Sequence, residues 1–481
     1  MPRRTKIVAT LGPATDDPAV LMALLQAGVD VGRINFSHGA EADHLGRIAQ
    51  FRDMAAKAKK VVAILADLPG PKLRVKIPGP LSLAPGDVLH FSLSTTPTAA
   101  DDIVITEPEV LADVRPGQRI LLDDGRLQLE AGTVENGRLA ATVKVGGTLL
   151  ENKGLNLPDT PLTIAAVTDR DRVALQIAAK AGVDWLALSF VRGPEAADEL
   201  RKAAADVGLG KVPVMAKIER PEGVLHAEAI VAAFDAIMVA RGDLGVEIPL
   251  EQVPMAQKRL IALARAAGKP VVTATDMMDS MRFNPRPTRA EASDVANAIL
   301  DGTDAVMLSG ETAVGKYPVE TVQCMADIAA EAERYLETTG QGFLERVLQQ
   351  PRNTIDDSMA LAACHLAHEV KAAAIVTPTL SGRTARLLAR YRPAARIVAP
   401  APNAAVLRTM AIVWGLRPVP MASLSPGDSR LVAAVRDAFL AGELTVGDRV
   451  VVLAGHPLEG GPGYPTVRVV RVGEGGTSQE P

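Results

Sequence analysis

Charged and hydroxyl-bearing side chains gather where short apolar segments of this sequence end. Eight such segments recur along the chain, and polar residues follow six of them. These residues are Arg33, Asn35, Ser37 and His38, then Asp67, then Lys217 and Glu219, then Arg241 and Asp243, then Thr275 and Asp276, and finally Ser309, Glu311 and Thr312. If the segments are parallel strands, their carboxyl ends meet at one rim, so these side chains share one site.

Two carboxylates among them suit a divalent cation. Lys217 and Glu219 alternate along one predicted strand, so both should point inward while Ile218 packs outward. Glu219 and Asp243 come from neighbouring strands, and a carboxylate pair that leaves room for water and substrate oxygens suits Mg²⁺ or Mn²⁺. Taken singly, Lys217 and Glu219 could form a plain salt bridge and Asp243 a helix cap. Their occurrence together at one rim favours a functional site.

The same rim carries groups that suit anions. Gly242 lets the backbone approach an anion closely, and the turn over residues 244–247 could present amide groups to a carboxylate. Arg33 and Arg74 offer planar guanidinium forks for phosphoryl oxygens, unless each pairs with a neighbouring acid. The sequence has no GxxxxGK[ST] loop, so a bound nucleotide needs another kind of site.

A barrel is the element arrangement that would position these residues. The eight apolar segments cover residues 7–11, 29–36, 61–67, 183–190, 212–219, 236–243, 271–276 and 305–309, with helical stretches such as 16–27, 169–181 and 290–300 between them. Continuous apolar runs are typical of strands that are buried on both faces, and intervening helices require parallel strands. Eight such units predict a closed (β/α)₈ barrel, an α/β fold.

Two further domains are expected. About 115 residues separate the third and fourth segments, where ~20–35 would be usual, and Gly-, Pro- and Asn-rich turns divide this stretch into short alternating strands. We therefore predict a small antiparallel β domain, a lid, at 71–160, inserted into a barrel formed by residues 1–70 and 161–344. Alternating helices and strands at 345–481 predict an open α/β domain, and the Gly-rich final residues look disordered.

Composition limits the class of protein. A chain of 481 residues has room for about three domains, and its 48% hydrophobic and 22% charged residues are those of a folded globular protein. A net charge of −4 favours no nucleic-acid partner. Two cysteines, Cys324 and Cys364, fit a reducing compartment, and no stretch approaches the ~20 apolar residues of a membrane span. We expect a cytoplasmic protein with no membrane partner.

The motifs together resemble those of pyruvate kinase. The stretches that carry the resemblance are Arg4-Thr-Lys-Ile-Val-Ala-Thr-Leu-Gly-Pro13, Arg33-Ile-Asn-Phe-Ser-His-Gly39, Met215-Ala-Lys-Ile-Glu219, Ile237-Met-Val-Ala-Arg-Gly-Asp-Leu-Gly-Val-Glu247, Pro287-Thr-Arg-Ala-Glu291 and Met307-Leu-Ser-Gly-Glu-Thr-Ala313. The resemblance as a whole runs in order from residue 4 to about 472 and covers the barrel, the lid and the C-terminal domain of that family.

The resemblance implies an activity: transfer of the phosphoryl group of phosphoenolpyruvate to ADP, giving pyruvate and ATP. It implies Mg²⁺ (or Mn²⁺) on Glu219 and Asp243. The remaining roles that it implies are phosphoenolpyruvate on Arg33, Lys217, Thr275 and the backbone of Gly242 and Asp243, and ADP beside Asn35, His38, Arg74 and Lys153. Lys217 would stabilise the transferring phosphoryl group, and Thr275 with a water chain at Ser309 would protonate the enolate.

Two departures from the family pattern matter. Asp276 stands where the family commonly has Gln, which leaves the charge balance near proton delivery open. Lys72 stands where much of the family has a Glu. The family's K⁺ site matches Asn35, Ser37, Asp67 and the backbone of Leu68, and the Lys72 ammonium could take the place of that ion between Asp67 and the substrate anions. We therefore predict that K⁺ is not required, unless Lys72 points into solvent.

The C-terminal domain contains a candidate effector site. Its loop carries Thr379, Ser381, Gly382, Arg383 and Thr384 between a predicted strand and helix. Hydroxyls and amides there would face a phosphate at a helix N-terminus, such as that of a sugar phosphate or AMP, unless they only cap the helix. The family is commonly an effector-regulated homotetramer, so we expect that assembly.

Two other functions compete with this interpretation. A Mg²⁺-dependent aldolase or lyase on the same barrel would also hold a pyruvate enolate on a Glu and an Asp, but it needs no nucleotide lid. A degenerate phosphometabolite sensor would keep the fold without turnover, and only Asp276 favours it. The lid, Lys217 and the pair Arg74 and Lys153 discriminate against the aldolase or lyase.

Overall fold

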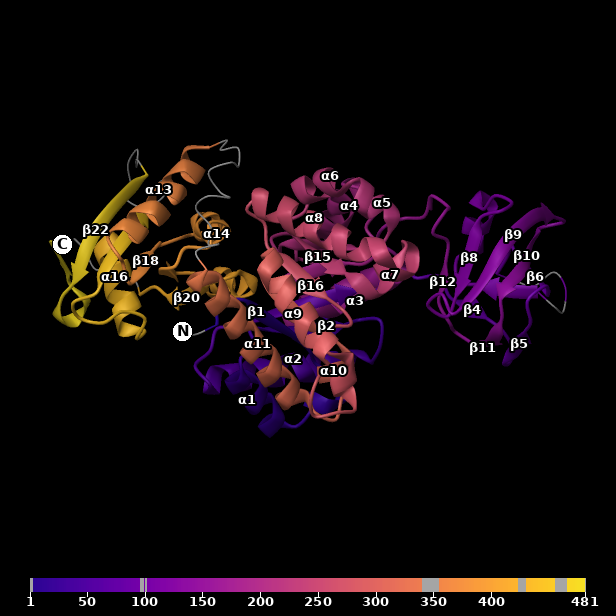
Figure 1. Cartoon of the computed structure of the whole chain (residues 1–481), viewed down its shortest axis with the longest axis horizontal. Coiled ribbons are helices and arrows are strands. Elements are labelled where there is room, and N and C mark those ends of the chain that lie inside the picture. Colours follow the sequence, from indigo (N-terminus) through magenta and orange to yellow (C-terminus); the bar gives the residue numbers. More distant parts are fainter. Residues whose placement is uncertain are drawn as a thin grey trace.

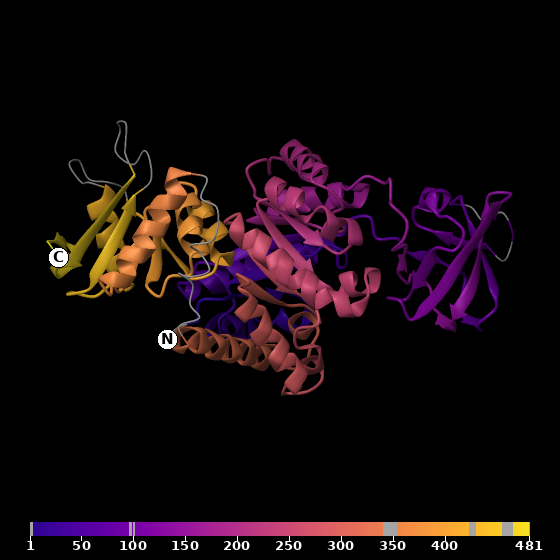
Figure 2. The same cartoon turned by 45° about the horizontal axis from the view of Figure 1, so that its top comes forward.

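The computed structural model describes residues 3–95, 99, 102–339, 354–422, 430–454 and 465–480. Three bodies lie along its long axis (Figure 1). The barrel is central, the inserted β domain projects from one end, and the C-terminal domain lies at the other. A view turned by 45° shows the same order (Figure 2). The predicted boundary between residues 344 and 345 lies outside the described residues.

Eight parallel strands close into a barrel, as the sequence predicts, in the order β1-β17-β16-β15-β14-β13-β3-β2. The strands are β1 (Lys6–Thr10), β2 (Val31–Asn35), β3 (Ala63–Leu68), β13 (Trp185–Leu188), β14 (Val214–Ile218), β15 (Ala236–Ala240), β16 (Val271–Ala274) and β17 (Ala305–Leu308). The main helices around them are α1 (Pro18–Ala27), α2 (Glu41–Lys57), α3 (Asp169–Ala181), α4 (Glu195–Asp206), α8 (Val253–Ala266), α9 (Arg289–Asp301) and α11 (Pro318–Thr338).

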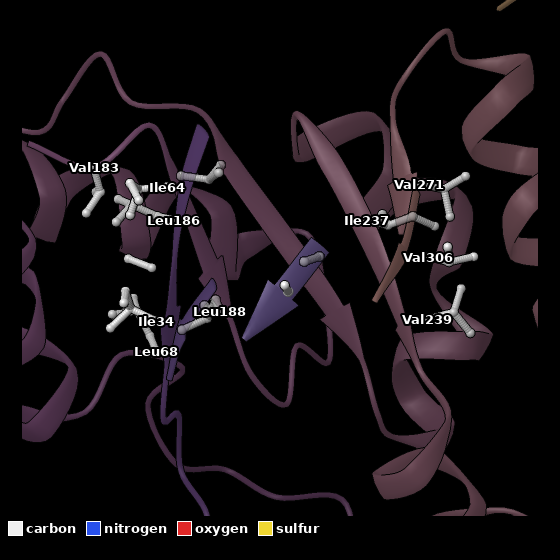
Figure 3. Close-up of a cluster of buried hydrophobic side chains, with 14 of the residues drawn as sticks. Ile34, Ile64, Leu68, Val183, Leu186, Leu188, Ile237, Val239, Val271 and Val306 are labelled. Atoms are coloured by element: carbon white, nitrogen blue, oxygen red, sulfur yellow. The ribbon is translucent and has the colours of Figure 1, made fainter. Parts of the chain in front are cut away.

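Alternation along the strands builds two separate cores. In β13, Leu186 and Leu188 pack beneath the helices, whereas Trp185 and Ala187 belong to the core inside the barrel. Figure 3 shows part of the outer core, with Ile64, Leu68, Leu186 and Leu188 side by side. Strands that bury both faces are mostly apolar, and the charged side chains of these strands, such as Asp67 and Lys217, lie near their carboxyl ends.

Strand six ends earlier than the sequence predicts. β15 ends at Ala240, and a short helix, α7 (Arg241–Glu247), replaces the predicted extension to residue 243. The run of apolar residues does not reveal this change, because Gly242 and Gly245 disfavour both helix and strand. As a result, Asp243 lies on a helix rather than at the end of a strand.

The inserted domain is a mostly antiparallel β structure. Its strands are β4 (Val75–Lys76), β5 (Leu81–Leu83), β6 (Val88–Ser92), β7 (Asp102–Ile105), β8 (Arg119–Leu122), β9 (Leu127–Glu135), β10 (Arg138–Val145), β11 (Gly147–Leu149) and β12 (Leu155–Asn156). Seven of them form one sheet, β12-β8-β9-β10-β6-β7-β4, in which β6 and β7 are parallel, while β5 and β11 pair separately. The domain has its own core of buried residues, including Phe91 and Leu139.

Two connections join this domain to the barrel, one from β3 to β4 and one from β12 to α3. The first is anchored at Gly70, whose amide donates to Oδ1 of Asp171 at 2.9 Å. Gly70 has φ +64°, and a Cβ there would lie 2.7 Å from the carbonyl oxygen of Ser189, so a side chain does not fit. The start of the lid is therefore fixed tightly to the barrel.

The C-terminal domain has a six-stranded sheet in the order β20-β19-β18-β21-β22-β23. Its elements are α13 (Ile355–Glu369), β18 (Ala374–Val376), α14 (Arg383–Arg390), β19 (Arg396–Ala401), α15 (Ala404–Thr409), β20 (Leu416–Pro420), α16 (Arg430–Leu440), β21 (Arg449–Ala454), β22 (Thr466–Val472) and β23 (Ser478–Gln479). The prediction of disorder at the final residues was wrong, because β23 pairs with β22 through Arg471–Gln479 and Val472–Ser478.

A short segment of this domain closes the bottom of the barrel. The 3₁₀ helix η5 (Met410–Ile412) is buried, and it belongs to the same continuous core as the inward-facing Val8, Trp185 and Met215 of the barrel strands. The indole nitrogen of Trp185 also donates to the carbonyl oxygen of Thr409 at 3.1 Å. The barrel interior and the C-terminal domain thus share one core. No helix within the described ranges is long and apolar enough to cross a bilayer.

Candidate active site

Asp67 is the centre of a buried charge cluster at the carboxyl rim of the barrel. Its side chain accepts a hydrogen bond from Nε of Arg33 at 2.7 Å and pairs with Nζ of Lys217 at 3.2 Å. Burial alone would raise the pKa of Asp67, but the charges of Lys217 and Arg33 outweigh it and hold this pKa below its usual range. Asp67 is therefore ionised, and it orients both cations.

Lys217 links three strands. Its ammonium lies 2.9 Å from Oε1 of Glu219 and donates to Oγ of Ser189 at 2.7 Å. Burial lowers the pKa of Lys217, but the carboxylates of Asp67 and Glu219 more than compensate, so the net shift is upward. Lys217 is a permanent cation here, and Ile218 packs outward, as expected from alternation.

Sequence reasoning missed Ser189. It follows strand β13, and besides accepting from Lys217 it donates to the carbonyl oxygen of Leu68 at 2.8 Å. The signal was available, since a polar residue directly after a buried strand is the same pattern that identified the other rim residues.

Glu219 has one carboxylate oxygen left for a cation. Its Oε2 accepts from the backbone amide of Phe190 at 2.7 Å. Its Oε1 is buried and has no hydrogen bond of good geometry, although Lys217 lies near it. Burial raises the pKa of Glu219, and Lys217 opposes this shift. A buried carboxylate oxygen without a full set of partners suits a hard divalent cation, so the residues present fit Mg²⁺.

Asp243 is the second carboxylate, and Lys72 contacts it. Nζ of Lys72 lies 3.1 Å from Oδ1 of Asp243, and both side chains are about 30% exposed. We expected the Lys72 ammonium beside Asp67. The structure differs, because Arg33 and Lys217 already surround Asp67 while the connection that carries Lys72 runs past α7. Lys72 does not point freely into solvent either.

The backbone at Thr275 and Asp276 is strained. Both residues have positive φ, 66° and 54°, and this is rare for a β-branched residue such as Thr275. Arg241 holds the segment, with Nη2 donating to the carbonyl oxygen of Thr275 at 2.8 Å. The amide of Gly242 donates to Oγ1 of Thr275 at 2.6 Å. Strain of this kind persists where the surroundings over-determine the backbone, which is typical of functional sites.

Ser309 presents a buried hydroxyl without a protein partner. Its Oγ has no hydrogen bond to another described residue, whereas its amide donates to Oε2 of Glu311 at 2.7 Å. Glu311 also accepts from the amide of Met278 at 3.2 Å, so it ties the ends of β17 and β16 together. Burial raises the pKa of Glu311. An orphaned hydroxyl in this position suits an ordered water molecule.

The residues expected on the nucleotide side lie around the start of the lid. Oδ1 of Asn35 accepts from the amide of Ser37 at 3.0 Å, which shapes the loop that carries the exposed His38. Partial burial and the positive charge of the nearby Arg74 lower the pKa of His38, while the Arg74 guanidinium donates to the carbonyl oxygen of Asn152 at 2.8 Å. Farther along the lid, Lys153 pairs with Oδ1 of Asp123 at 2.6 Å.

The candidate effector loop forms a tight helix start. Thr379 accepts from the amide of Gly382 at 2.9 Å, and Ser381 accepts from the amide of Arg383 at 3.4 Å. Gly382 has a left-handed backbone, φ 77°, and Ser381 and Arg383 are exposed. Both hydroxyls thus make ordinary capping contacts at the start of α14, while the exposed side chains stay accessible.

The arrangement brings Arg33, Asp67, Lys217, Glu219 and Asp243 to one rim, which can bind an anion and a hard cation together. In the described part of the chain, no group of three or more His, Cys, Asp or Glu side chains could hold a metal. A metal bound by Glu219 and Asp243 would therefore take its remaining ligands from water or substrate, as Mg²⁺ commonly does.

Comparisons with known proteins agree with this geometry. Residues 2–322 match the family model described as the pyruvate kinase barrel domain, and residues 357–470 match the pyruvate kinase alpha/beta domain. The chain is 44% identical over 462 residues to a pyruvate kinase of Geobacillus stearothermophilus, covering 95% of this chain and 78% of that one. It is 41% identical to a pyruvate kinase of Clostridium acetobutylicum, covering 95% and 96%.

A solved structure shows the same fold. The crystal structure of a pyruvate kinase from Cryptosporidium parvum superimposes with a TM-score of 0.90 at 32% sequence identity, covering 98% of this chain and 96% of that one. Together with the two domain matches and the strand order of the barrel, these similarities establish that the chain belongs to the pyruvate kinase family.

Proposed function

We propose that the protein transfers the phosphoryl group of phosphoenolpyruvate to ADP, giving pyruvate and ATP. The observation that carries the proposal is the buried Lys217 ammonium, which lies beside Asp67 and Glu219 at the rim of the barrel. A phosphoryl group in transfer spreads negative charge over its oxygens, and a fixed cation stabilises that charge most where water is excluded.

We assign the divalent cation to Glu219 and Asp243. Mg²⁺, or Mn²⁺ in its place, supplies a Lewis acid that stabilises charge on phosphoryl and enolate oxygens. The support in this chain is Oε1 of Glu219, a buried oxygen with an incomplete set of partners. Asp243 lies at the start of α7, where Lys72 contacts its Oδ1 at 3.1 Å.

Arg33 and Lys217 bind and orient the phosphoryl group of the donor, and Asp67 fixes both of their side chains. Asn35, His38, Arg74 and Lys153 are assigned to the acceptor ADP, since Arg74 and Lys153 belong to the lid and Asn35 and His38 to the facing loop. The backbone of Gly242 and Asp243, at the start of α7, is assigned to the substrate carboxylate.

Protonation of the enolate carbon completes the reaction. A Thr hydroxyl is a weak acid, so Thr275 orders a water molecule rather than giving up its own proton. Ser309 supports this assignment, because its buried hydroxyl has no hydrogen-bond partner among the residues that the structure describes and can hold such a water molecule. Asp276, an acid where the family commonly has Gln, lies next to Thr275, and burial together with the nearby Asp279 raises the pKa of its carboxyl.

We further propose that K⁺ is not required. The family's K⁺ positions, Asn35, Ser37, Asp67 and Leu68, are present, but Lys72 brings a permanent positive charge to the same rim. The Lys72 ammonium contacts the carboxylate of Asp243 rather than that of Asp67. It still lies among the anionic groups of the site, so it can offset their charge as a monovalent ion would.

Regulation is proposed at the loop that carries Thr379, Ser381, Gly382, Arg383 and Thr384. A sugar phosphate or AMP would bind there, and a homotetramer is the proposed assembly. Exposure of Ser381 and Arg383 at the start of α14 supports an anion site. The two alternatives, a pyruvate-enolate aldolase or lyase and a degenerate phosphometabolite sensor, predict no ATP formation.

One assay tests these functions against each other. Purified protein is mixed with phosphoenolpyruvate, ADP and Mg²⁺, and pyruvate and ATP are measured separately. Equal amounts of both products support the proposal. Pyruvate or enolate chemistry without ADP would support the aldolase or lyase, and binding of phosphoenolpyruvate without turnover would support the sensor.

A further inference from the structure

The short helix α7 is held at both of its ends by side chains of the lid and of its connections. From the β3–β4 connection, Nζ of Lys72 reaches Oδ1 of Asp243 at 3.1 Å, near the first turn of the helix. From the end of β12, Nδ2 of Asn156 donates to Oε1 of Glu247 at 2.7 Å, at the last residue of the helix. Each end of α7 therefore has a polar contact with a residue at the start or the end of the inserted domain.

Arg220 extends the second contact into the barrel. Its Nη1 lies 3.3 Å from Oε1 of Glu247, the same oxygen that accepts from Asn156. Its Nη2 donates to the carbonyl oxygens of Leu157 and Thr160 at 3.1 and 3.2 Å. Arg220 directly follows the proposed metal ligand Glu219. The β12–α3 connection is therefore fixed to Arg220, which adjoins Glu219, and the end of β12 is fixed to Glu247, four residues from Asp243.

These contacts are buried and not easily replaced by water. The exposed fractions are 8% for Asn156, 2% for Glu247 and 3% for Arg220. Oε2 of Glu247 has no hydrogen-bond partner among the described residues, so Oε1 carries the polar contacts of that carboxylate. Hydrogen bonds to a buried charged group are stronger than neutral ones, and their loss leaves the charge poorly solvated.

α7 has seven residues, about two turns of helix with a rise of about 1.5 Å per residue, so Glu247 lies about one turn from Asp243 on the same helix. We propose that Glu247, with Asn156 and Arg220, is a positioning residue that makes the place of Gly242 and Asp243 depend on the position of the lid. By linkage, ligands that fix α7 also favour one lid position.

The coupling between the lid and α7 is a property of the free protein and can be measured without turnover. Its meaning for catalysis rests on the proposed function, which assigns the metal and substrate to the start of α7. Hydrogen exchange of the free protein therefore tests the coupling, and the substrate assay tests the function, so that either one can fail alone.

The test compares Asn156→Ala with Gln118→Ala by hydrogen exchange. Gln118 directly precedes β8 in the lid, and it contacts the β12–α3 connection at the carbonyl oxygen of Asp159 and Oγ1 of Thr160, whereas none of its hydrogen bonds goes to α7. We expect Asn156→Ala to speed exchange of the amides at 241–247 by about tenfold, the effect of losing one hydrogen bond to a charged group. Gln118→Ala should speed exchange near residues 157–160 and leave 241–247 unchanged.

Glu247→Gln provides a second variant that keeps the shape of the side chain. It should speed hydrogen exchange of the α7 amides as Asn156→Ala does. The exchange rate of the double variant should be close to that of either single variant, because the two residues share one contact. The proposal is overturned if Asn156→Ala leaves exchange at 241–247 at the parent rate. It is also overturned if Gln118→Ala speeds exchange there equally, or if the two variants are additive.

Steady-state kinetics supply a second readout. Asn156→Ala should raise the apparent KM for phosphoenolpyruvate and for Mg²⁺ more than it lowers kcat, since it displaces binding groups without removing one. A purely structural loss would lower the active fraction and leave both KM values unchanged, and that result would count against a positioning role.

Discussion

Nζ of Lys217 lies 2.9 Å from Oε1 of Glu219, the buried oxygen that we assign to the divalent cation. A divalent cation held by Glu219 would share this oxygen with the ammonium. Asp67 and Ser189 would still orient Lys217, since both contact Nζ independently of Glu219.

Lys217→Met tests this arrangement. Because Lys217 acts on charge that develops in the transition state, we expect kcat to fall by about 10²–10³-fold with a much smaller change in KM. Steady-state rates with phosphoenolpyruvate and ADP measure both. A loss below about tenfold in kcat would remove Lys217 from the chemistry.

Lys72→Glu tests the predicted independence from K⁺. The parent enzyme should be as active in tetramethylammonium chloride as in KCl at equal ionic strength, because Lys72 already supplies a positive charge. The variant should become K⁺-activated, since it restores an acid at the position where much of the family has one. Strong K⁺ activation of the parent would contradict the prediction, and Lys72→Met controls for loss of the charge alone.

Asp67→Asn tests the central carboxylate through its pH dependence. The folded pKa of Asp67 lies below its usual value, so its stabilising effect is present above about pH 4 and is lost only as the pH falls through the folded pKa. The variant leaves Arg33 and Lys217 with one partner fewer, and we expect its melting temperature at pH 7 to fall clearly below that of the parent.

The difference between the two melting temperatures should stay constant from pH 7 to about pH 5 and narrow only below about pH 4. Melting curves of both proteins over this range measure it. A difference that already narrows between pH 7 and pH 5 would mean that Asp67 titrates near its usual value or above it, contrary to the charge cluster described.

Ser381→Asp tests the effector loop. An added carboxylate beside the proposed phosphate position should repel an anionic effector, so activation and thermal shift by sugar phosphates or AMP should be weakened or lost. Basal activity should be unchanged, because the loop starts α14 in the C-terminal domain and lies outside the barrel rim. An undiminished response to the effector would place the effector elsewhere.

Much of the fold could be predicted from the sequence because a buried parallel strand leaves a clear pattern. The eight apolar runs predicted the closed barrel. Because the carboxyl ends of parallel strands meet at one rim, Asp67, Lys217 and Glu219 were correctly expected to lie together there. The end of strand six could not be placed, because α7 depends on tertiary contacts of Arg241 and Glu247 that lie far apart in sequence. Local residue preference in this stretch favours neither helix nor strand.

The partners of charged side chains were also beyond the reach of sequence reasoning. Lys72 could have faced any acid at the rim, and only the path of the lid connection brings it to Asp243. The prediction of disorder at the final residues was wrong for a related reason. Their composition is that of a disordered tail, but pairing with β22 orders Ser478 and Gln479, and composition carries no information about such a neighbour.

The closure of the barrel by η5 means that the C-terminal domain is not an interchangeable module. Met410, Ala411 and Ile412 belong to the core that fills the barrel, so a chain cut after α11 would expose Trp185 and its neighbours to water. Loss of the domain would therefore require a different set of side chains in the interior of the barrel. Separate expression of the barrel should accordingly yield an aggregating protein.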